Sequence, residues 1–301
     1  MISNQPQLTQ FYTWKNYRCA YEIRQPDRTP GDRQIPLLLI HPIGVGLSRQ
    51  FWQRFCLTWY REGNQNSLYN PDLLGCGESE MPRVACYPED WANQMQYFIE
   101  NIVRQPVIIV VQGALFPVAI YCTQKCPELI KGLVLAGPPA WTLMKTPASL
   151  QQQKIIWNLL ASPLGWGFFR YARRRQFLQS FSVRQLFDRP EDVDTEWLET
   201  LKIGSDTMAS RHAVFSFLAG FWREDFQEAI AAISQPTLAV FGNKASSISR
   251  PGKTETPDRR LESYLEHFPN IQGCKIVGRN VLPYESPQEF VRVVSEFVKT
   301  L

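Results

Sequence analysis

Residues 107–120 read Val-Ile-Ile-Val-Val-Gln-Gly-Ala-Leu-Phe-Pro-Val-Ala-Ile, and they decide how the rest of the chain is interpreted. The stretch starts with an apolar, mostly β-branched run that is too short to cross a membrane. Such a run is typical of a buried parallel strand. The small residues that follow it, beginning with Gly113, indicate a tight turn into a helix. The stretch therefore predicts a central strand, a sharp turn and a helix.

Strand and helix patterns alternate on both sides of this stretch. Apolar runs predict strands at residues 36–40, 133–136, 237–241 and 275–277. Apolar residues at helical spacing predict helices at residues 51–61, 88–103, 116–125, 258–268 and 287–301. Residues 11–24 alternate apolar and polar side chains around Lys15-Asn16, which favours a β-hairpin at a sheet edge. This alternation predicts the α/β class, with a mostly parallel sheet covered by helices on both faces.

The alternation stops between residues 140 and 233. The pattern there is helical throughout, rich in aromatic residues and arginine, and it includes no convincing strand. We therefore expect an all-helical cap at residues 140–233. It would be inserted into an α/β core made of residues 1–139 and 234–301.

Composition argues against several classes of protein. The chain has 301 residues, of which 44% are hydrophobic and 20% are charged, which is ordinary for a globular protein and unlike a disordered or fibrous one. Its formal net charge of +4 gives little support to nucleic-acid binding. The first residues lack the basic flank and apolar core of a secretory signal, and no apolar run is long enough to span a bilayer.

The seven cysteines bear on location and on metal binding. Their odd number and scattered positions, without an export signal, indicate free thiols in a reducing compartment such as the cytoplasm. Cys122 and Cys126 lie one helical turn apart, but no second pair of cysteines or histidines accompanies them. Neither a metal site nor a cofactor is therefore expected.

Four motifs occur in an order and spacing that resemble the α/β-hydrolase superfamily over nearly the whole chain. They are Leu-Leu-Leu-Ile-His-Pro-Ile-Gly at residues 37–44, Asp-Leu-Leu-Gly-Cys-Gly-Glu-Ser at 72–79, Pro-Thr-Leu-Ala-Val-Phe-Gly at 236–242 and Pro-Tyr-Glu-Ser-Pro at 283–287. The first corresponds to a strand and its oxyanion loop, usually H-G-x-G, with Pro42 in the second position. The chain is most similar to cap-bearing members such as haloalkane dehalogenase, epoxide hydrolase and pheophytinase-like groups.

The chain also resembles a hydrolase-like group of cyanobacteria and chloroplasts. That likeness adds the plastid stroma to the expected locations, with peripheral contact to a membrane as a further option. The fold that the superfamily implies is a mostly parallel central sheet flanked by helices, with an inserted all-helical cap.

The resemblance implies a catalytic triad of serine, acid and histidine, but the chain departs from it at each position. The serine of the G-x-S-x-G turn falls on Gly113, the acid on Ala245 and the histidine on Asn280. These residue types cannot attack a substrate, accept its proton or orient a base. A shift by one residue does not help, because it lands on Gln112, Ala114, Arg279 or Val281. The coordinated loss predicts a pseudoenzyme without ordinary ester hydrolysis.

An active hydrolase or lyase with other catalytic residues is the alternative. It needs a base, and the chain has three histidines. His41 lies in the oxyanion loop, where propping the strand ends is favoured over catalysis. His212 lies in a predicted cap helix and could face the cavity, whereas His267 lies at a helix end and is expected at the surface. Asp72 and Ser79 are expected to hold their own loop by hydrogen bonds.

Folds of this kind leave an apolar cavity between cap and sheet. Its expected wall consists of His41, Pro42, Ile43, Gly44, Gln112, Gly113, Ala114, Trp141, Phe215 and Trp222, with Trp157, Phe217 and Phe221 as further aromatic candidates. A glycine at the turn leaves open the space that a serine side chain would fill. The hypothesis is therefore a non-hydrolytic protein that binds an apolar or ester-like small molecule.

An arginine-rich stretch of the cap offers a second function. Helical spacing over residues 162–181 puts Arg170, Arg173 and Arg174 on one helix face. The simpler interpretation is a solvated basic face. The other is a docking face for an anionic membrane surface or an acidic protein partner, with the chain acting as a scaffold or assembly factor.

Overall fold

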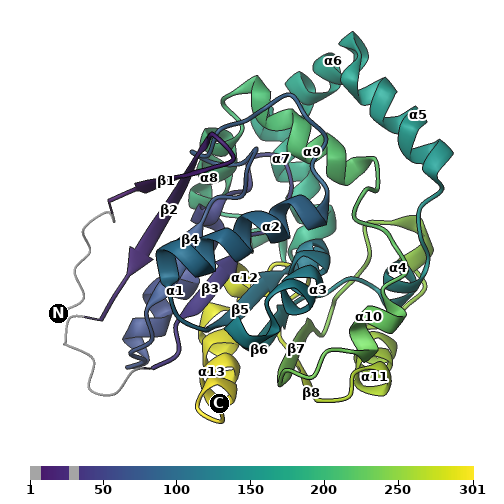
Figure 1. Cartoon of the computed structure of the whole chain (residues 1–301). Helices are drawn as coiled ribbons and strands as arrows, with labels where there is room; N and C mark the ends of the chain where they lie inside the picture. Colours follow the sequence, from purple (N-terminus) through teal and green to yellow (C-terminus); the bar gives the residue numbers. More distant parts are fainter. Residues whose placement is uncertain (1–7, 27–33) are drawn as a thin grey trace.

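The apolar run that opens the deciding stretch forms β5 (Val107–Gln112), a strand whose side chains are all buried. The computed structural model describes residues 8–26 and 34–301. Its other strands are β1 (Gln10–Trp14), β2 (Tyr17–Arg24), β3 (Leu37–Ile40), β4 (Leu68–Pro71), β6 (Ile130–Ala136), β7 (Thr237–Gly242) and β8 (Ile271–Ile276). Together they form one eight-stranded sheet in the order β1-β2-β4-β3-β5-β6-β7-β8, with β5 near its middle (Figure 1). The predicted α/β class is confirmed.

The strands at the two edges of the sheet were predicted from sequence with different accuracy. β1 and β2 form the predicted antiparallel hairpin, and Lys15 and Asn16 adopt the left-handed φ of its tight turn. The last strand was expected at residues 275–277, but β8 occupies Ile271–Ile276 instead. β8 is an edge strand that pairs only with β7, and most of its side chains are partly or fully exposed. A search for buried apolar runs therefore misses its first four residues.

Helices cover both faces of the sheet. They are α1 (Gln53–Arg61), α2 (Pro88–Phe98), α3 (Phe116–Lys125), α4 (Trp141–Lys145), α5 (Leu150–Ala161), α6 (Pro163–Ala172), α7 (Arg175–Phe181), α8 (Thr195–Gly204), α9 (Arg211–Leu218), α10 (Gln227–Ala231), α11 (Pro257–His267), α12 (Leu282–Glu285) and α13 (Pro287–Val298). Residues of α2, α3 and α11 pack in one core cluster, and residues of α1 and α13 pack in another. Alternate residues of β5 point into the two clusters, so the sheet separates them. Within the described residues, no helix combines the length and apolar character that a membrane span needs.

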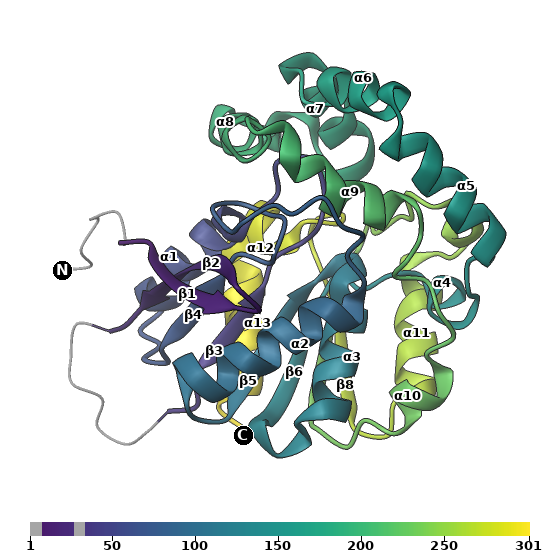
Figure 2. The same ribbon diagram turned by 45° about the horizontal axis from the view of Figure 1, so that its top comes forward.

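Between β6 and β7 the chain forms helices only. Residues 140–233 all belong to the described part of the chain, and they include no strand. Helices α5 to α9 gather above one end of the sheet (Figure 2). The first and last helices of the interval, α4 and α10, instead pack against α11 beside the sheet. The division into core and cap at residues 140 and 233 remains a prediction.

A buried ion-pair network fixes the loop after β4. The Asp72 carboxylate is fully buried and accepts hydrogen bonds from the backbone N–H of Arg49 at 2.8 Å, from the Arg49 guanidinium, and from the N–H of Glu78 at 2.8 Å. Arg49 also pairs with Glu22 at 3.0 Å and with Glu78. The Ser79 hydroxyl donates to the Asp72 carbonyl at 2.9 Å. The predicted structural role of Asp72 and Ser79 is therefore confirmed.

Candidate functional site

The turn after β5 has the geometry that its sequence predicts. Gly113 adopts a φ of +61°, a left-handed conformation that favours glycine, and the chain then passes through a short 3-10 helix (Gly113–Leu115) into α3. Within the part of the chain that the structure describes, a Cβ atom built on Gly113 would meet only the carbonyl oxygen of Gly137, at 4.0 Å. The predicted strand, turn and helix are confirmed, and the space beside the turn is open.

Asn280 and Ala245 lie close to one another beyond the ends of β8 and β7. The Asn280 amide donates to the carbonyl oxygens of Gln185 at 2.7 Å and Ser246 at 3.0 Å, and its Oδ1 accepts from the Ser246 N–H at 3.2 Å. Ala245 precedes Ser246 and is buried. The side chain of Asn280 is thus committed to holding backbone in place.

Gln112 links this group to the turn after β5. Its Nε2 donates to the carbonyl oxygen of Asn280 at 2.7 Å. The three positions that the sequence singled out, Gly113, Ala245 and Asn280, therefore lie around one end of the sheet. The side chains at these positions offer no nucleophile, no base and no carboxylate.

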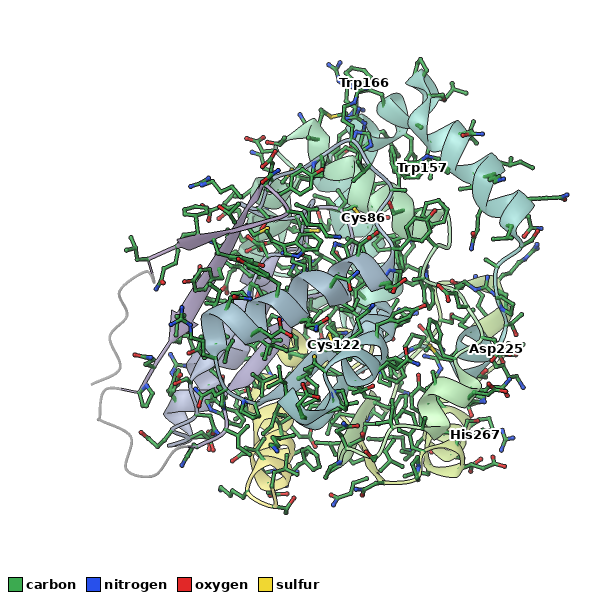
Figure 3. All side chains as sticks on the ribbon, in the orientation of Figure 1. Cys86, Cys122, Trp157, Trp166, Asp225 and His267 are labelled. Atoms are coloured by element: carbon green, nitrogen blue, oxygen red, sulfur yellow. The ribbon has the colours of Figure 1, made fainter. Side chains whose placement is uncertain are left out.

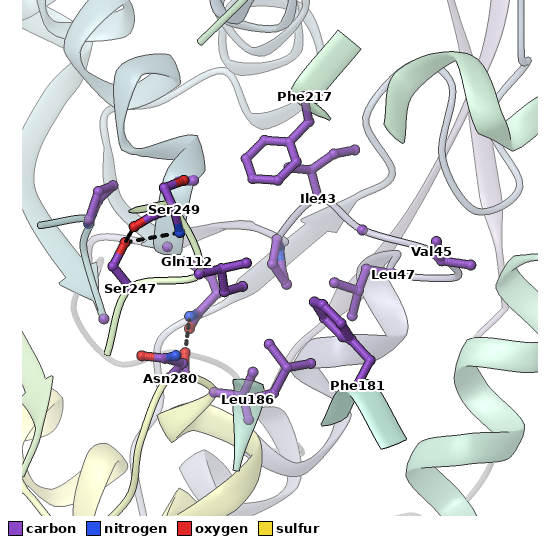
Figure 4. Close-up of a pocket in the computed structure, with 18 of the residues that line it drawn as sticks. Ile43, Val45, Leu47, Gln112, Phe181, Leu186, Phe217, Ser247, Ser249 and Asn280 are labelled. Atoms are coloured by element: carbon purple, nitrogen blue, oxygen red, sulfur yellow. Dashed lines mark hydrogen bonds between the residues drawn. The ribbon is translucent and has the colours of Figure 1, made fainter. Parts of the chain in front are cut away.

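A cavity of about 270 Å³ opens above the turn (Figure 4). Seven of the ten residues expected in its wall do line it: Pro42, Ile43, Gly44, Gln112, Gly113, Ala114 and Trp222. Phe217 also lines it, as the sequence suggested. Much of the remaining wall comes from apolar side chains of the helical segment, such as Phe181 and Leu186, which the sequence analysis did not select for the wall. Their helical periodicity indicated that these side chains are packed, but it did not indicate that they face the cavity.

His41 was expected in the wall, and this prediction is wrong. The side chain is fully buried, its Nδ1–H donates to the carbonyl of Pro42 at 2.8 Å, and its Nε2 accepts from the N–H of Leu73 at 3.1 Å. These partners fix the neutral tautomer with the proton on Nδ1. Burial lowers the pKa of His41, although Asp72 acts in the opposite direction. His41 props the strand ends, which is the role that the sequence analysis favoured over catalysis.

His212 also fails to reach the cavity. It lies on α9, is 7% exposed, and is absent from the residues that line the wall. Burial, together with the charges of Arg211 and Arg83, lowers the pKa of His212 to about 4. The imidazole is therefore neutral at pH 7, but it has no access to a molecule bound above Gly113. Neither candidate base faces the cavity.

Two aromatic residues expected in the wall pack elsewhere. Trp141 packs on His267 with ring centroids 4.3 Å apart, and its ring also contacts that of Tyr264. Both partners belong to α11, and His267 lies at the opposite end of the molecule from Trp166 (Figure 3). His267, which was expected at the surface, is therefore partly buried by its contact with Trp141. Phe215 packs edge to face on Phe169 at 5.9 Å.

Trp157 and Phe221, the two further aromatic candidates, also lie outside the cavity wall. Their rings pack on each other with centroids 5.5 Å apart. Helical spacing identified all of these as packed residues and could not tell which neighbour each would meet.

The cavity has a polar side and an apolar side. Gln112, Ser247, Ser249 and Asn280 lie on one side in Figure 4, and Phe181 and other apolar residues lie opposite. Gln112 Oε1 is buried and has no hydrogen-bond donor among the described residues. Arg260, which the sequence analysis did not select, also lines the wall and is 3% exposed. Over residues 8–26 and 34–301, no cluster of histidine, cysteine, aspartate or glutamate side chains is suited to hold a metal ion.

The three cap arginines do not share one helix face. α6 ends at Ala172, so Arg173 and Arg174 lie in the turn before α7. Arg173 donates to the carbonyl oxygens of Ser205 at 3.1 Å and Asp206 at 2.6 Å. Arg170 lies over the ring of Trp166, which projects at the outer end of the cap (Figure 3). The predicted continuous basic face is wrong because the helix breaks inside it, and docking through these arginines remains a prediction.

Comparisons with known proteins agree on the fold. The sequence matches the Alpha/beta hydrolase family over residues 37–293. No curated protein matches it significantly. A malate-bound thermophilic esterase from Thermogutta terrifontis is 17% identical, with a TM-score of 0.71 over 98% of this chain and 99% of that one.

Two other solved structures are similar over their whole length. The serine hydrolase CarC, involved in carbazole degradation, is 16% identical with a TM-score of 0.73, over 98% of this chain and 100% of its own. The epoxide hydrolase CorEH is 19% identical with a TM-score of 0.70, over 98% and 99%. At such low identity, these likenesses show the fold alone.

Proposed function

The chain belongs to the Alpha/beta hydrolase family, and we propose that it is a member without the serine-acid-histidine triad. In this proposal it binds an apolar or ester-like small molecule above Gly113 and does not hydrolyse it. The observation that carries the proposal is the turn after β5, where a glycine stands beside open space at the mouth of an apolar cavity. Esterase and epoxide hydrolase relatives of the same fold suggest an ester-sized or similarly apolar ligand.

The chemistry of a triad supports the loss of hydrolysis. A triad works because a base takes the proton of the nucleophile while a carboxylate orients that base and stabilises its charge. Gly113 supplies no nucleophile, and the Asn280 amide is neither basic nor free, since it holds the backbone of Ser246 and Gln185. Ala245 supplies no carboxylate.

The placement of the histidines gives further support. A general base must come within hydrogen-bond reach of the proton that it abstracts, directly or through one water. Both ring nitrogens of His41 are occupied by backbone groups, and His212 lies outside the wall. An alternative mechanism that uses either residue thus has no support from their positions.

Filling the turn tests the proposal. We expect the wild-type protein to bind methyl octanoate without releasing octanoate, and Gly113→Phe to weaken that binding at least about a hundredfold. The phenyl ring would displace several buried methylene groups of the ligand, each of which contributes about 0.8 kcal/mol. Isothermal titration calorimetry measures the affinity, and gas chromatography of the same mixture measures hydrolysis.

Gly63→Phe is the matched control. Gly63 has a similar left-handed φ of +81° and is exposed in the turn after α1. Among the described residues, no atom lies within 4 Å of a Cβ built on it. The backbone strain is therefore comparable, but the cavity is untouched, and we expect wild-type affinity. Unchanged affinity in Gly113→Phe would argue against binding above the turn, and protein-dependent release of octanoate would argue against a non-hydrolytic role.

A further inference from the structure

Arg260 is a buried cation without a matching anion. It lies on α11, is 3% exposed and lines the cavity. Its one hydrogen bond to the described residues is a long one, from Nη2 to the carbonyl oxygen of Gly252 at 3.4 Å. Its Nε is buried without a partner, and no carboxylate in the described part of the chain lies within 4.0 Å of it.

Arg49 is a buried arginine of the same protein whose charge is balanced by carboxylates, and it can be compared with Arg260. Arg49 is 1% exposed and pairs with Glu22, Asp72 and Glu78. Burial lowers the pKa of Arg49, but these carboxylates outweigh burial and raise it. For Arg260, burial outweighs the more distant Glu255, and the pKa is lowered. The two side chains are equally buried, and only one has its charge balanced.

Glu255 cannot easily move to balance Arg260. Its carboxylate oxygens accept from the backbone N–H groups of Trp141 at 2.8 Å and Thr142 at 2.7 Å, and from the Thr142 hydroxyl. They thereby satisfy the first N–H groups of α4, which otherwise have no partner inside the helix. Pairing Glu255 with Arg260 would break these bonds. An anion that pairs with Arg260 would therefore have to come from outside the described residues.

The position of Arg260 fits the head group of an amphipathic ligand. Gly252, its hydrogen-bond partner, ends the segment that carries Ser247 and Ser249 on the polar side of the cavity (Figure 4). Phe181, from α7 of the helical segment, lies on the opposite side. A ligand with its charged end at Arg260 would thus direct an apolar chain toward the cap helices.

We propose that the ligand of the cavity is a monocarboxylate with an apolar chain, and that its carboxylate pairs with the Arg260 guanidinium. This inference rests on the proposed binding function and narrows it from apolar molecules in general to aliphatic acids. The planar guanidinium presents N–H donors in a fork that matches a carboxylate. The ligand removes the cost of burying an unpaired cation.

Octanoate and octanol form the decisive pair of probes, since they share a chain and differ in the head group. By calorimetry at pH 7, we expect the wild-type protein to bind octanoate about ten- to a hundredfold more tightly than octanol, the range of a charge-assisted hydrogen bond. In Arg260→Met the preference should disappear through weaker octanoate binding. The variant should fold, because an apolar side chain of similar volume avoids the desolvation cost of a buried charge that has no partner.

Arg223→Met is the matched control. Arg223 is also partly buried with a lowered pKa caused by burial, and its Nη2 donates to the carbonyl of Thr146 at 3.1 Å, but it does not line the cavity. The Arg223→Met variant should still bind octanoate more tightly than octanol. Two results would overturn the inference about Arg260 but leave the proposed binding function standing. One is equal affinity of the wild-type protein for octanoate and octanol, and the other is a preference for octanoate that survives in Arg260→Met. If neither probe binds and methyl octanoate does not bind either, the proposed function fails as well.

Discussion

Asp72→Ala is expected to lower the free energy of unfolding by about 3 to 5 kcal/mol, the usual cost of removing one partner from a buried ion pair. Asp72 is fully buried and holds the backbone of Arg49 and Glu78 as well as the Arg49 side chain. Its removal leaves a buried guanidinium with fewer counter-charges and two backbone N–H groups without acceptors. Urea denaturation followed by far-UV circular dichroism measures the loss.

An exposed ion pair provides the control for the loss of stability in Asp72→Ala. Glu262 pairs with Arg259 on α11 at 3.3 Å, and both side chains are more than 60% exposed. Glu262→Ala should cost less than about 1 kcal/mol because exposed pairs are screened by water. If the Asp72 and Glu262 variants lost similar stability, the network around Arg49 would not anchor the loop after β4.

Rebuilding the triad is expected to create an esterase. The triple variant Gly113→Ser, Ala245→Asp and Asn280→His places a nucleophile, an acid and a base around one end of the sheet. The Gln112 side chain still holds the backbone carbonyl of residue 280 beside the turn, because that bond does not use the Asn280 side chain. Removing one triad member from a working hydrolase lowers kcat by about 10⁴ to 10⁶. Even a poorly aligned triad should therefore raise hydrolysis of p-nitrophenyl octanoate at least about a hundredfold over the wild-type rate.

The double variant Gly113→Ser and Ala245→Asp keeps Asn280 and so lacks the base. It should remain as inactive as the wild-type protein, and circular dichroism would show that both variants are folded. A folded triple variant that is no faster than the double variant would mean that the three positions do not correspond to a triad.

Much of the fold could be predicted because burial leaves a clear pattern in sequence. β5 lies inside the sheet with helices on both faces, so each of its residues had to be apolar or neutral, and the run could be recognised. β8 lies at the edge and includes Gln272 and Lys275, which are exposed, so the same criterion placed it too late in the chain. The helix break between Ala172 and Arg175 was missed because the residues on both sides have good helical spacing.

The parts of the site that could be predicted from sequence are those whose position follows from backbone conformation or from motif spacing. The left-handed turn at Gly113 follows from local sequence, and motif spacing brought in Ala245 and Asn280. The direction of a side chain depends on its tertiary neighbours, which is why His41 and Trp141 were assigned to a wall that they do not line. Arg260 resembled any surface arginine of an amphipathic helix, and only its position in the cavity wall and its missing partner distinguish it.

The most direct test of a binding protein without hydrolysis is native mass spectrometry of the wild-type chain mixed with p-nitrophenyl octanoate. A non-covalent complex that carries the mass of the intact ester, with no nitrophenol released beyond the buffer rate, is the expected result. A protein whose mass has increased by one octanoyl group, or nitrophenol release that rises with protein concentration, would contradict the account, because either would reveal a nucleophile that the residues at Gly113, Ala245 and Asn280 do not provide.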